Sequence, residues 1–156
     1  MATSSPQEGQ PVPQAAAIPY RRARGFVEFC LITSAGKGRW GFPKGFVDAG
    51  ETATETALKE AFEEAGLHGE VEGESLGRYG YRKWNLSLVV DVYLMRVTHE
   101  EASWEEAAFR ERAWFTADEA AQRLERKALR DLLSVAMQRM HPSGARRFLS
   151  SGGEMG

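Results

Sequence analysis

A helix whose two ends are both marked in the sequence constrains the fold of this chain more than any other feature. Thr52 and Glu55 have the spacing of a capping box, in which each side chain accepts a hydrogen bond from a free backbone amide at the start of a helix. Gly66 stands where a left-handed residue would end the helix, with Leu67 behind it as a hydrophobic partner. We therefore predict a helix that has Thr52 as its N-cap and runs to Ala65.

The acidic side chains of this helix lie where local electrostatics opposes them. At about 100° per residue, one face carries apolar residues that we expect to pack on a sheet, namely Leu58, Ala61, Phe62 and Ala65. The opposite face carries Glu60, Glu63 and Glu64, whose charges repel one another, and the last two fall where the helix dipole favours cations. One interpretation is a solvated acidic face, which is common. The other is a divalent cation such as Mg²⁺, which binds carboxylate oxygens.

The loop before the helix favours the second interpretation. Residues 41–51 contain three glycines and a proline, which give a loop fixed and unusual backbone geometry. Such a loop can bring backbone groups close to a ligand. Lys59 is the only cation within the helix, and Glu51, just before the cap, is its natural partner.

The remaining pattern predicts a mixed sheet with two more helices. Runs of β-branched, aromatic and alternating apolar residues predict strands at 26–33, 40–42, 71–81, 86–97 and 113–115. A second capping box, Thr116 with Glu119, opens one helix, and an amphipathic helix is expected over residues 127–140. Because the strands surround helices without regular alternation, the fold class is predicted as α/β in the broad sense, an α+β sandwich with a mixed sheet.

The two ends of the chain differ in composition from its middle. Four of the six prolines lie within residues 1–19, among serine, glutamine and glycine, and residues 141–156 are rich in serine and glycine. Segments of this kind cannot bury a core. We therefore predict a disordered N-terminal arm at 1–19, one folded domain at 20–140 and a flexible tail at 141–156.

Charge and composition exclude several classes of protein. The net charge is −2, and the single cysteine, Cys30, cannot form an intramolecular disulfide. No apolar run approaches the ~18 residues that cross a bilayer, and no secretory signal opens the chain. We expect a cytoplasmic protein without a membrane partner, and the balanced charge gives no reason to expect nucleic acid.

The loop and the helix together resemble the Nudix box. Gly45, five residues, Glu51, seven residues and then residues 59–67 match the fixed positions of that motif, except that Lys59 stands where the family has arginine. By this resemblance Glu51, Lys59 and Gly66 are structural, and Glu51 orients the box through a salt bridge to Lys59. Lysine is a point donor and lacks the fork of arginine, so a looser loop is expected.

The resemblance extends from about residue 20 to residue 133 and implies a fold and a reaction. The family has an α-β-α sandwich and cleaves nucleoside diphosphates linked to another moiety, with Mg²⁺, or Mn²⁺ in its place, as cofactor. Glu60, Glu63 and Glu64 are then the catalytic residues and, with the Gly45 carbonyl, the metal ligands, while Glu63 is either a ligand or the general base. A metal would screen the phosphate oxygens, and a carboxylate would take the proton of the attacking water. A non-catalytic Nudix-like domain that binds an effector is the alternative.

The segment before the box indicates the kind of substrate. Residues 20–45 hold six basic residues and one acidic residue, which favours a polyphosphorylated small molecule and makes Arg39 and Lys44 candidate phosphate contacts. A looser resemblance to the branch with diadenosine polyphosphate hydrolases and diphosphoinositol polyphosphate phosphohydrolases implies further contacts by Arg21, Arg22, Ser34, Arg82, Lys83 and Lys127.

Within this branch the sequence favours a nucleoside substrate. Phe46 stands where the inositol enzymes often carry a second glycine, so a diadenosine polyphosphate or related nucleoside polyphosphate is the predicted substrate. Tyr79, Tyr81 and Trp84 either stack an adenine base or pack on the sheet. Diphosphoinositol polyphosphate and the 5′ ends of RNA remain alternatives.

Overall fold

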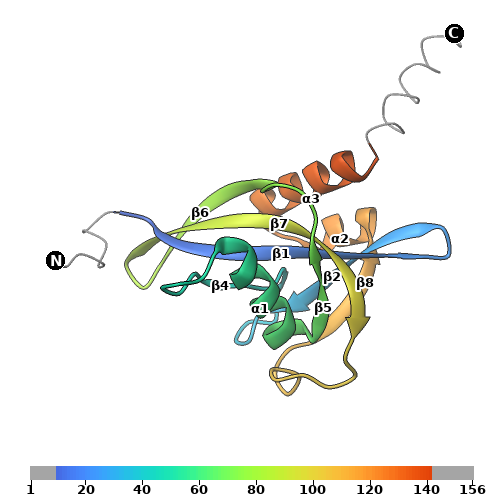
Figure 1. Ribbon diagram of the computed structural model, residues 1–156, viewed down its shortest axis with the longest axis horizontal. Helices are drawn as coiled ribbons and strands as arrows, with labels where there is room; N and C mark the ends of the chain where they lie inside the picture. Colours follow the sequence, from blue (N-terminus) through green and yellow to red (C-terminus); the bar gives the residue numbers. More distant parts are fainter. Residues whose placement is uncertain (1–9, 142–156) are drawn as a thin grey trace, which may run out of the picture.

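A mixed eight-stranded sheet runs through the computed structural model, which describes residues 10–141 (Figure 1). The strands are β1 (Val12–Ala23), β2 (Phe26–Thr33), β3 (Trp40–Gly41), β4 (Lys44–Phe46), β5 (Leu67–Val71), β6 (Gly77–Lys83), β7 (Leu86–Glu100) and β8 (Arg112–Thr116). The helices are α1 (Ala53–Ala65), α2 (Ala117–Arg123) and α3 (Lys127–Met140).

Strand β1 is central to the sheet order β3-β2-β1-β7-β5. It pairs in parallel with β7 and in antiparallel fashion with β2 and β4, while β6 pairs with β7 and β8 pairs with β2. Among the described strands, only β1 and β7 form a parallel pair.

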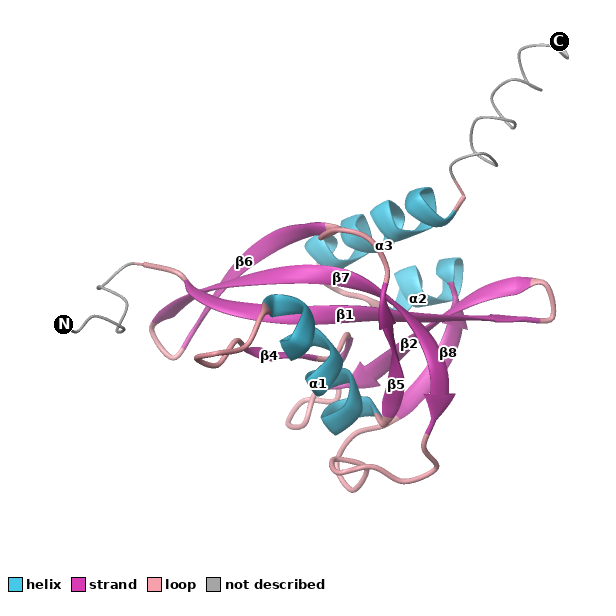
Figure 2. Ribbon diagram, viewed as in Figure 1, coloured by secondary structure: helices cyan, strands magenta, loops and turns pink. Residues whose placement is uncertain are grey.

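The sheet lies between two helical layers, with α1 on one face and α2 and α3 on the other (Figure 2). Successive residues of β1 point to opposite faces, so Ala15 and Ala17 pack toward α1 while Ala16 and Ile18 join the core beneath α2 and α3. The predicted α-β-α sandwich with a mixed sheet is confirmed.

Helix α1 begins and ends where the sequence predicts. The Thr52 hydroxyl accepts a hydrogen bond from the Glu55 amide, the Glu55 carboxylate accepts one from the Thr52 amide, and Gly66 is left-handed at φ 68°. The predicted core face is wrong at Phe62, whose side chain is 44% exposed and lies 5.0 Å from the His68 ring. The buried face of α1 is formed by Ala57, Ala61 and Ala65, and at about 100° per residue Phe62 falls at the margin of that face.

The predicted disordered arm is wrong for residues 12–19, which form the first part of β1. Residues 15–18 are almost fully buried. Strand β1 pairs with β4 over residues 14–16 and with β2 over residues 20–23. Pro13 and Pro19 are tolerated because they lie outside these two antiparallel stretches. Residues 1–9, and the predicted tail from residue 142 onward, lie outside the described residues.

The strand predicted over residues 71–81 is two strands in the structure. Strand β5 ends at Val71 and β6 begins at Gly77, and both pair with β7, at residues 95–100 and 86–92 respectively. Gly73 has φ 78°, a left-handed conformation that breaks the extended chain between them. The predicted loop before α1 also contains the short strand β4.

No helix in the part of the chain that the structure describes is both long and apolar enough to cross a membrane.

Candidate active site

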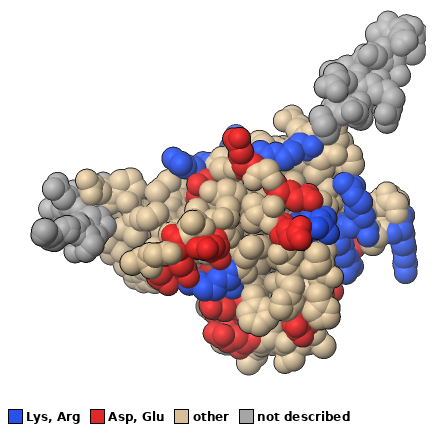
Figure 3. Space-filling model, in the orientation of Figure 1, with Lys and Arg blue, Asp and Glu red and all other residues tan. Residues whose placement is uncertain are grey.

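Helix α1 carries its carboxylates into a partly buried position rather than into open solvent. Acidic side chains gather over α1 on the face shown in Figure 3, yet Glu64 is only 8% exposed. Burial, followed by the nearby carboxylates of Glu64 and Glu63, raises the pKa of Glu60 to about 8. Burial also raises the pKa of Glu64, although the Arg110 guanidinium opposes this. The interpretation of a solvated acidic face therefore does not hold for Glu60 and Glu64.

Strand β4 brings backbone directly against these carboxylates. A Cβ placed on Gly45 would lie 2.3 Å from the Glu60 carboxyl carbon, so only glycine fits there. The Lys44 amide donates a hydrogen bond to Glu64 Oε1 at 3.1 Å. The loop thus approaches α1 as closely as the sequence predicts for a ligand-binding loop.

The ion pair expected between Glu51 and Lys59 is present. Lys59 Nζ lies 2.8 Å from Glu51 Oε2 and 3.1 Å from Asp48 Oδ2. Hydrogen bonds from Lys59 and from the Thr56 hydroxyl hold the pKa of Glu51 below its usual value. The lysine therefore ties both the residue before the helix and the preceding loop to α1.

The C-terminal end of α1 is held by residues 101–112, which we call the carbonyl clamp. The last turn of α1 contains no basic residue, so its free carbonyls need partners from elsewhere. The clamp supplies one donor to each, namely the Glu106 amide to Glu63 (3.3 Å), Trp104 Nε1 to Glu64 (2.9 Å), Arg112 Nη1 to Ala65 (2.8 Å) and the Glu101 amide to Gly66 (2.9 Å).

Arg110, also from the carbonyl clamp, reaches the acidic side chains themselves. Its Nη2 lies 3.5 Å from Glu64 Oε2, and its Nε lies 2.5 Å from Glu106 Oε1. Its Nη1 donates to the Thr33 carbonyl oxygen at 2.9 Å, which fixes the guanidinium to β2. Arg110 thus places a largely buried positive charge beside the carboxylates of α1.

Two neighbouring cavities each reach some of these carboxylates. The first has a volume of about 570 Å³ and reaches Glu64, while the second has a volume of about 410 Å³ and reaches Glu60 and Glu63. Lys44, Tyr81 and Lys83 line both cavities. A ligand that extends from one cavity into the other would therefore pass the α1 carboxylates.

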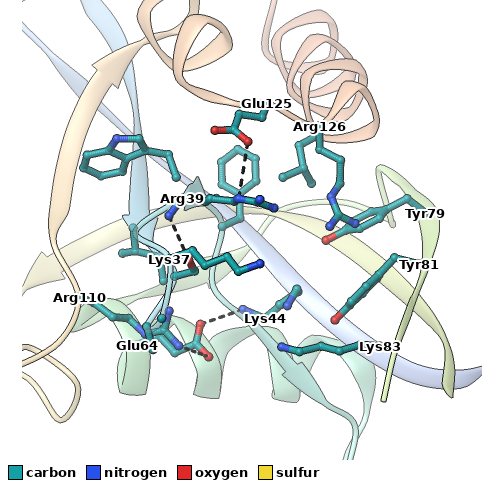
Figure 4. Close-up of a pocket in the computed structure, with 18 of the residues that line it drawn as sticks. Lys37, Arg39, Lys44, Glu64, Tyr79, Tyr81, Lys83, Arg110, Glu125 and Arg126 are labelled. Atoms are coloured by element: carbon teal, nitrogen blue, oxygen red, sulfur yellow. Dashed lines mark hydrogen bonds and ion pairs between the residues drawn. The ribbon is translucent and has the colours of Figure 1, made fainter. Parts of the chain in front are cut away.

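The first cavity is strongly basic, although the chain as a whole carries a net negative charge. Two acidic residues, Glu64 and Glu125, line it together with seven basic ones: Lys37, Arg39, Lys44, Arg82, Lys83, Arg110 and Arg126. Lys37, Lys44 and Lys83 extend into the cavity, and the Arg126 guanidinium lies 5.1 Å from the centre of the Tyr81 ring (Figure 4). Such a concentration of positive charge attracts polyanionic ligands.

Residues 11–135 match the family model described as NUDIX domain. The chain belongs to the Nudix family. The resemblance of residues 45–67 to the Nudix box is thereby confirmed at the level of the family, and α1 is the helix of that box.

Two Nudix proteins of Arabidopsis thaliana are similar in sequence. Nudix hydrolase 4 is 39% identical over 108 residues, which are 67% of this chain and 52% of that protein. Nudix hydrolase 21, chloroplastic, is 32% identical over 128 residues, which are 78% of this chain and 64% of that protein. The matched part is thus between half and two thirds of the length of these relatives.

Solved structures of Nudix proteins share the fold. A Caenorhabditis elegans Ap4A hydrolase binary complex aligns with a TM-score of 0.74 and 22% identity over 83% of this chain and 97% of that one. The NUDIX domain of Shewanella oneidensis NrtR, complexed with ADP ribose, aligns with a TM-score of 0.69 and 18% identity over 84% and 89% of the two chains. At these identities the likeness concerns the fold.

The structure brings most of the expected phosphate contacts together. Ser34, Arg39, Lys44, Arg82 and Lys83 all line the first cavity. The Ser34 hydroxyl accepts a hydrogen bond from the Arg39 amide at 3.0 Å, so it also shapes the turn that carries Arg39.

Three other residues expected to contact phosphate lie outside both cavities. Arg21 and Arg22 belong to the β1–β2 hairpin and line neither cavity. Arg21 is bound at 2.8 Å to Glu28, because the hairpin turns these residues toward each other. Lys127 pairs with Asp131 at 2.8 Å one turn further along α3.

Sequence reasoning missed Lys37, Arg110 and Arg126 as cavity residues. Lys37 lies in the glycine turn that follows β2, so the excess of basic residues before the box was the available signal. Arg110 and Arg126 reach the cavity only through the fold, from the carbonyl clamp and from the residue before α3. No local pattern in the sequence marks either of them.

Proposed function

We propose that this Nudix domain is a hydrolase that cleaves a phosphoanhydride bond in a polyphosphorylated small molecule, with a divalent metal ion as cofactor. The substrate that we favour is a diadenosine polyphosphate or a related nucleoside polyphosphate. The observation that carries this proposal is that the basic cavity, which reaches Glu64, shares Lys44, Tyr81 and Lys83 with the cavity that reaches Glu60 and Glu63. Phosphate oxygens bound by the basic residues would hold the reacting phosphorus beside the carboxylates.

The carboxylates fit a hard divalent cation such as Mg²⁺ or Mn²⁺. They offer oxygen ligands only, and burial and the neighbouring carboxylates raise the pKa of Glu60, an effect that a bound cation would oppose. Within residues 10–141, no three acidic, histidine or cysteine side chains are already gathered in a metal-binding cluster. Glu60, Glu63 and Glu64, with the Gly45 carbonyl, are the groups that would hold the ion. When bound, such an ion neutralises phosphate oxygens and lowers the pKa of water.

The protein's own residues would then carry the remaining work. A box carboxylate accepts the proton of the attacking water as general base, and Glu63 is our candidate because it lies at the second cavity beside Glu60. Lys44 and Arg110 flank Glu64 and would bind the oxygens of the reacting phosphate. The Glu51–Lys59 ion pair and the carbonyl clamp hold the two ends of α1, which keeps the carboxylates in position.

A second candidate substrate is supported by the density of positive charge. Seven basic residues line the first cavity, more than two or three phosphates in a row require. A diphosphoinositol polyphosphate would use such a cavity more completely than a nucleoside substrate. An effector-binding domain without catalysis would use the same residues.

The cytoplasmic location expected from the sequence stays a prediction.

Product analysis by anion-exchange chromatography tests both substrates together. The purified full chain with Mg²⁺ would be given diadenosine polyphosphates, diphosphoinositol polyphosphate, ADP-ribose and triphosphorylated RNA in parallel. We expect Glu63→Gln and Glu64→Gln each to lower turnover by roughly 10²–10⁴-fold, the range for loss of a catalytic acid–base group, with little change in the unfolding midpoint. Glu74→Gln, at an exposed glutamate outside both cavities, is the matched control.

The outcomes separate the candidates. Cleavage of one substrate class that is lost in Glu63→Gln and kept in Glu74→Gln would support the hydrolase and identify its substrate. Unchanged turnover in both box variants would refute the assignment of the carboxylates. Metal-dependent binding without turnover of any compound would favour the effector-binding domain.

A further inference from the structure

The tip of the β6–β7 hairpin displays a large aromatic side chain on left-handed backbone. Trp84 is 66% exposed and has φ 54°, and Asn85, which follows it, has φ 63°. Glycine adopts this left-handed conformation freely, whereas a bulky residue rarely does. Both residues form the two-residue turn between Lys83 and Leu86, which are paired, and a tight hairpin turn of this kind needs positive φ at both positions. The turn therefore accounts for the backbone, and what remains to be explained is the exposed indole, which adds little to the core.

Trp84 is one side of an aromatic surface at the rim of the second cavity. The Phe46 ring stacks on it, with centroids 6.3 Å apart and planes inclined by 25°. Phe46 is itself 37% exposed and directly follows Gly45, whose Cα packs against Glu60. The aromatic pair therefore lies next to the carboxylates of α1, and both rings line the second cavity.

The two cavities differ in the chemistry that they offer. The first is basic, and Glu64 and Glu125 are its only acidic lining residues. The second combines three carboxylates and three lysines with the Phe46–Trp84 pair. A molecule with a polyphosphate chain at one end and a flat aromatic ring at the other would therefore be oriented, with its phosphates in the first cavity and its ring at the second.

The tyrosines expected to stack a base are already engaged. Lys44 Nζ lies 5.2 Å and the Arg126 guanidinium 5.1 Å from the centre of the Tyr81 ring. The Tyr81 hydroxyl donates a hydrogen bond to Gln14 Oε1 at 2.8 Å, and Tyr79 stacks on Tyr81 with centroids 6.2 Å apart. Both tyrosines are also partly buried against the core, whereas Trp84 is 66% exposed, so the tyrosines suit a wall of the phosphate cavity more than a base-binding site.

We propose that Trp84, supported by Phe46, is the stacking platform for the nucleobase of a nucleoside polyphosphate. Trp84 is then a specificity-determining residue, which selects phosphate compounds that carry an aromatic ring. Lys83, whose Nζ lies 4.5 Å from the centre of the Trp84 ring, lines both cavities and connects this platform to the phosphate-binding residues. The inference rests on the proposed function for the position of the phosphates.

Calorimetric titration tests the platform without requiring turnover. The full chain carrying Glu63→Gln would be titrated with ATP and with inorganic tripolyphosphate, both with Mg²⁺. Adding Trp84→Ala is expected to raise the Kd of ATP roughly tenfold, within the range known for base–aromatic stacking, and to change that of tripolyphosphate by less than about twofold. Trp84→Phe should restore most of the ATP affinity. Phe26→Ala removes an aromatic side chain that is 64% exposed but lines neither cavity, and should change neither Kd.

Several results would overturn the inference. Equal weakening of ATP and of tripolyphosphate binding on adding Trp84→Ala would overturn it, and so would no weakening of either. A finding that the Glu63→Gln chain binds ATP no more tightly than tripolyphosphate would also overturn it. Sedimentation that shows self-association abolished by Trp84→Ala, with unchanged ATP binding, would instead make Trp84 a contact between copies of the chain. A selective loss of ATP affinity, combined with no hydrolysis of any nucleoside polyphosphate by the unsubstituted chain, would refute the proposed function and leave the base site standing.

Discussion

Replacing Gly66 with alanine should destabilise the fold through two separable effects. The first is backbone strain, because φ is 68° and an alanine in the left-handed region costs about 1 kcal/mol. The second is overpacking, because the new Cβ would lie 2.8 Å from the Cβ of Trp104 and 3.0 Å from Arg112 Nη1. Overpacking of this kind costs about 1–3 kcal/mol, so the total expected loss is about 2–4 kcal/mol.

The neighbours of Gly66 cannot move without cost. Trp104 Nε1 donates to the Glu64 carbonyl at 2.9 Å, and Arg112 Nη1 donates to the Ala65 carbonyl at 2.8 Å. Any shift that makes room for a methyl group would loosen the carbonyl clamp at the end of α1. The substitution therefore probes how firmly the clamp is fixed.

Gly38→Ala is the matched control. Gly38 has nearly the same φ, 67°, but a Cβ there would have no heavy atom within 4 Å. Its expected loss is only the strain of about 1 kcal/mol. Urea unfolding followed by circular dichroism, with linear extrapolation to water, gives both free energies of unfolding. Equal losses at the two positions would refute a rigid clamp, and a harmless Gly66→Ala would refute the left-handed helix end.

Two further predictions concern buried and paired groups. Burial raises the pKa of the Cys30 thiol to about 12. A thiol reagent at about pH 8 should therefore label the chain only as fast as the chain unfolds. Rapid labelling of the folded chain would contradict the burial of this side chain. The Lys59 ammonium holds the pKa of Glu51 below its usual value of 4.5. The ion pair therefore stabilises the fold above that pH, and this stability is lost as the pH falls through the folded-state pKa. As the pH is lowered, the thermal unfolding midpoint of Glu51→Gln should fall less steeply than that of the unsubstituted chain. Equal slopes for the two proteins would show that the ion pair does not cause the loss of stability in acid.

The sequence predicted those elements that local chemistry determines. Both capping boxes, Thr52 with Glu55 and Thr116 with Glu119, are formed, since each depends on residues three apart along the chain. The end of α1 at Gly66 followed equally from one residue type at one position. The Nudix box could be identified for the same reason, because its residues are fixed by spacing.

Elements that depend on distant partners were missed. Strand β1 contains two prolines and several alanines, which indicate a flexible arm until β4, β2 and β7 are known to surround it. Proline is compatible with β1 because Pro13 and Pro19 fall outside the stretches that pair with β4 and with β2, and that depends on register rather than composition.

The same reason explains which site residues were missed. Arg110 approaches Glu64 from the carbonyl clamp, and Arg126 approaches Tyr81 from the residue before α3. Each contact joins residues more than forty positions apart, and no periodicity in the sequence reports such a contact. Arg21, which the resemblance grouped with the phosphate contacts, is paired instead with Glu28 across its own hairpin.

The central position of β1 also affects how the chain can fold. Its contact with β2 is made through the tight turn at Arg24 and Gly25 and can form early. Its other long edge is completed by β7, which begins only at Leu86. Joining such distant segments costs loop-closure entropy before their contacts form, and non-local pairing of this kind slows folding. Until β7 arrives, the alanine-rich edge of β1 is open to pairing with another chain. The pairing with β7 therefore protects this edge only after the second half of the chain has joined the first strand.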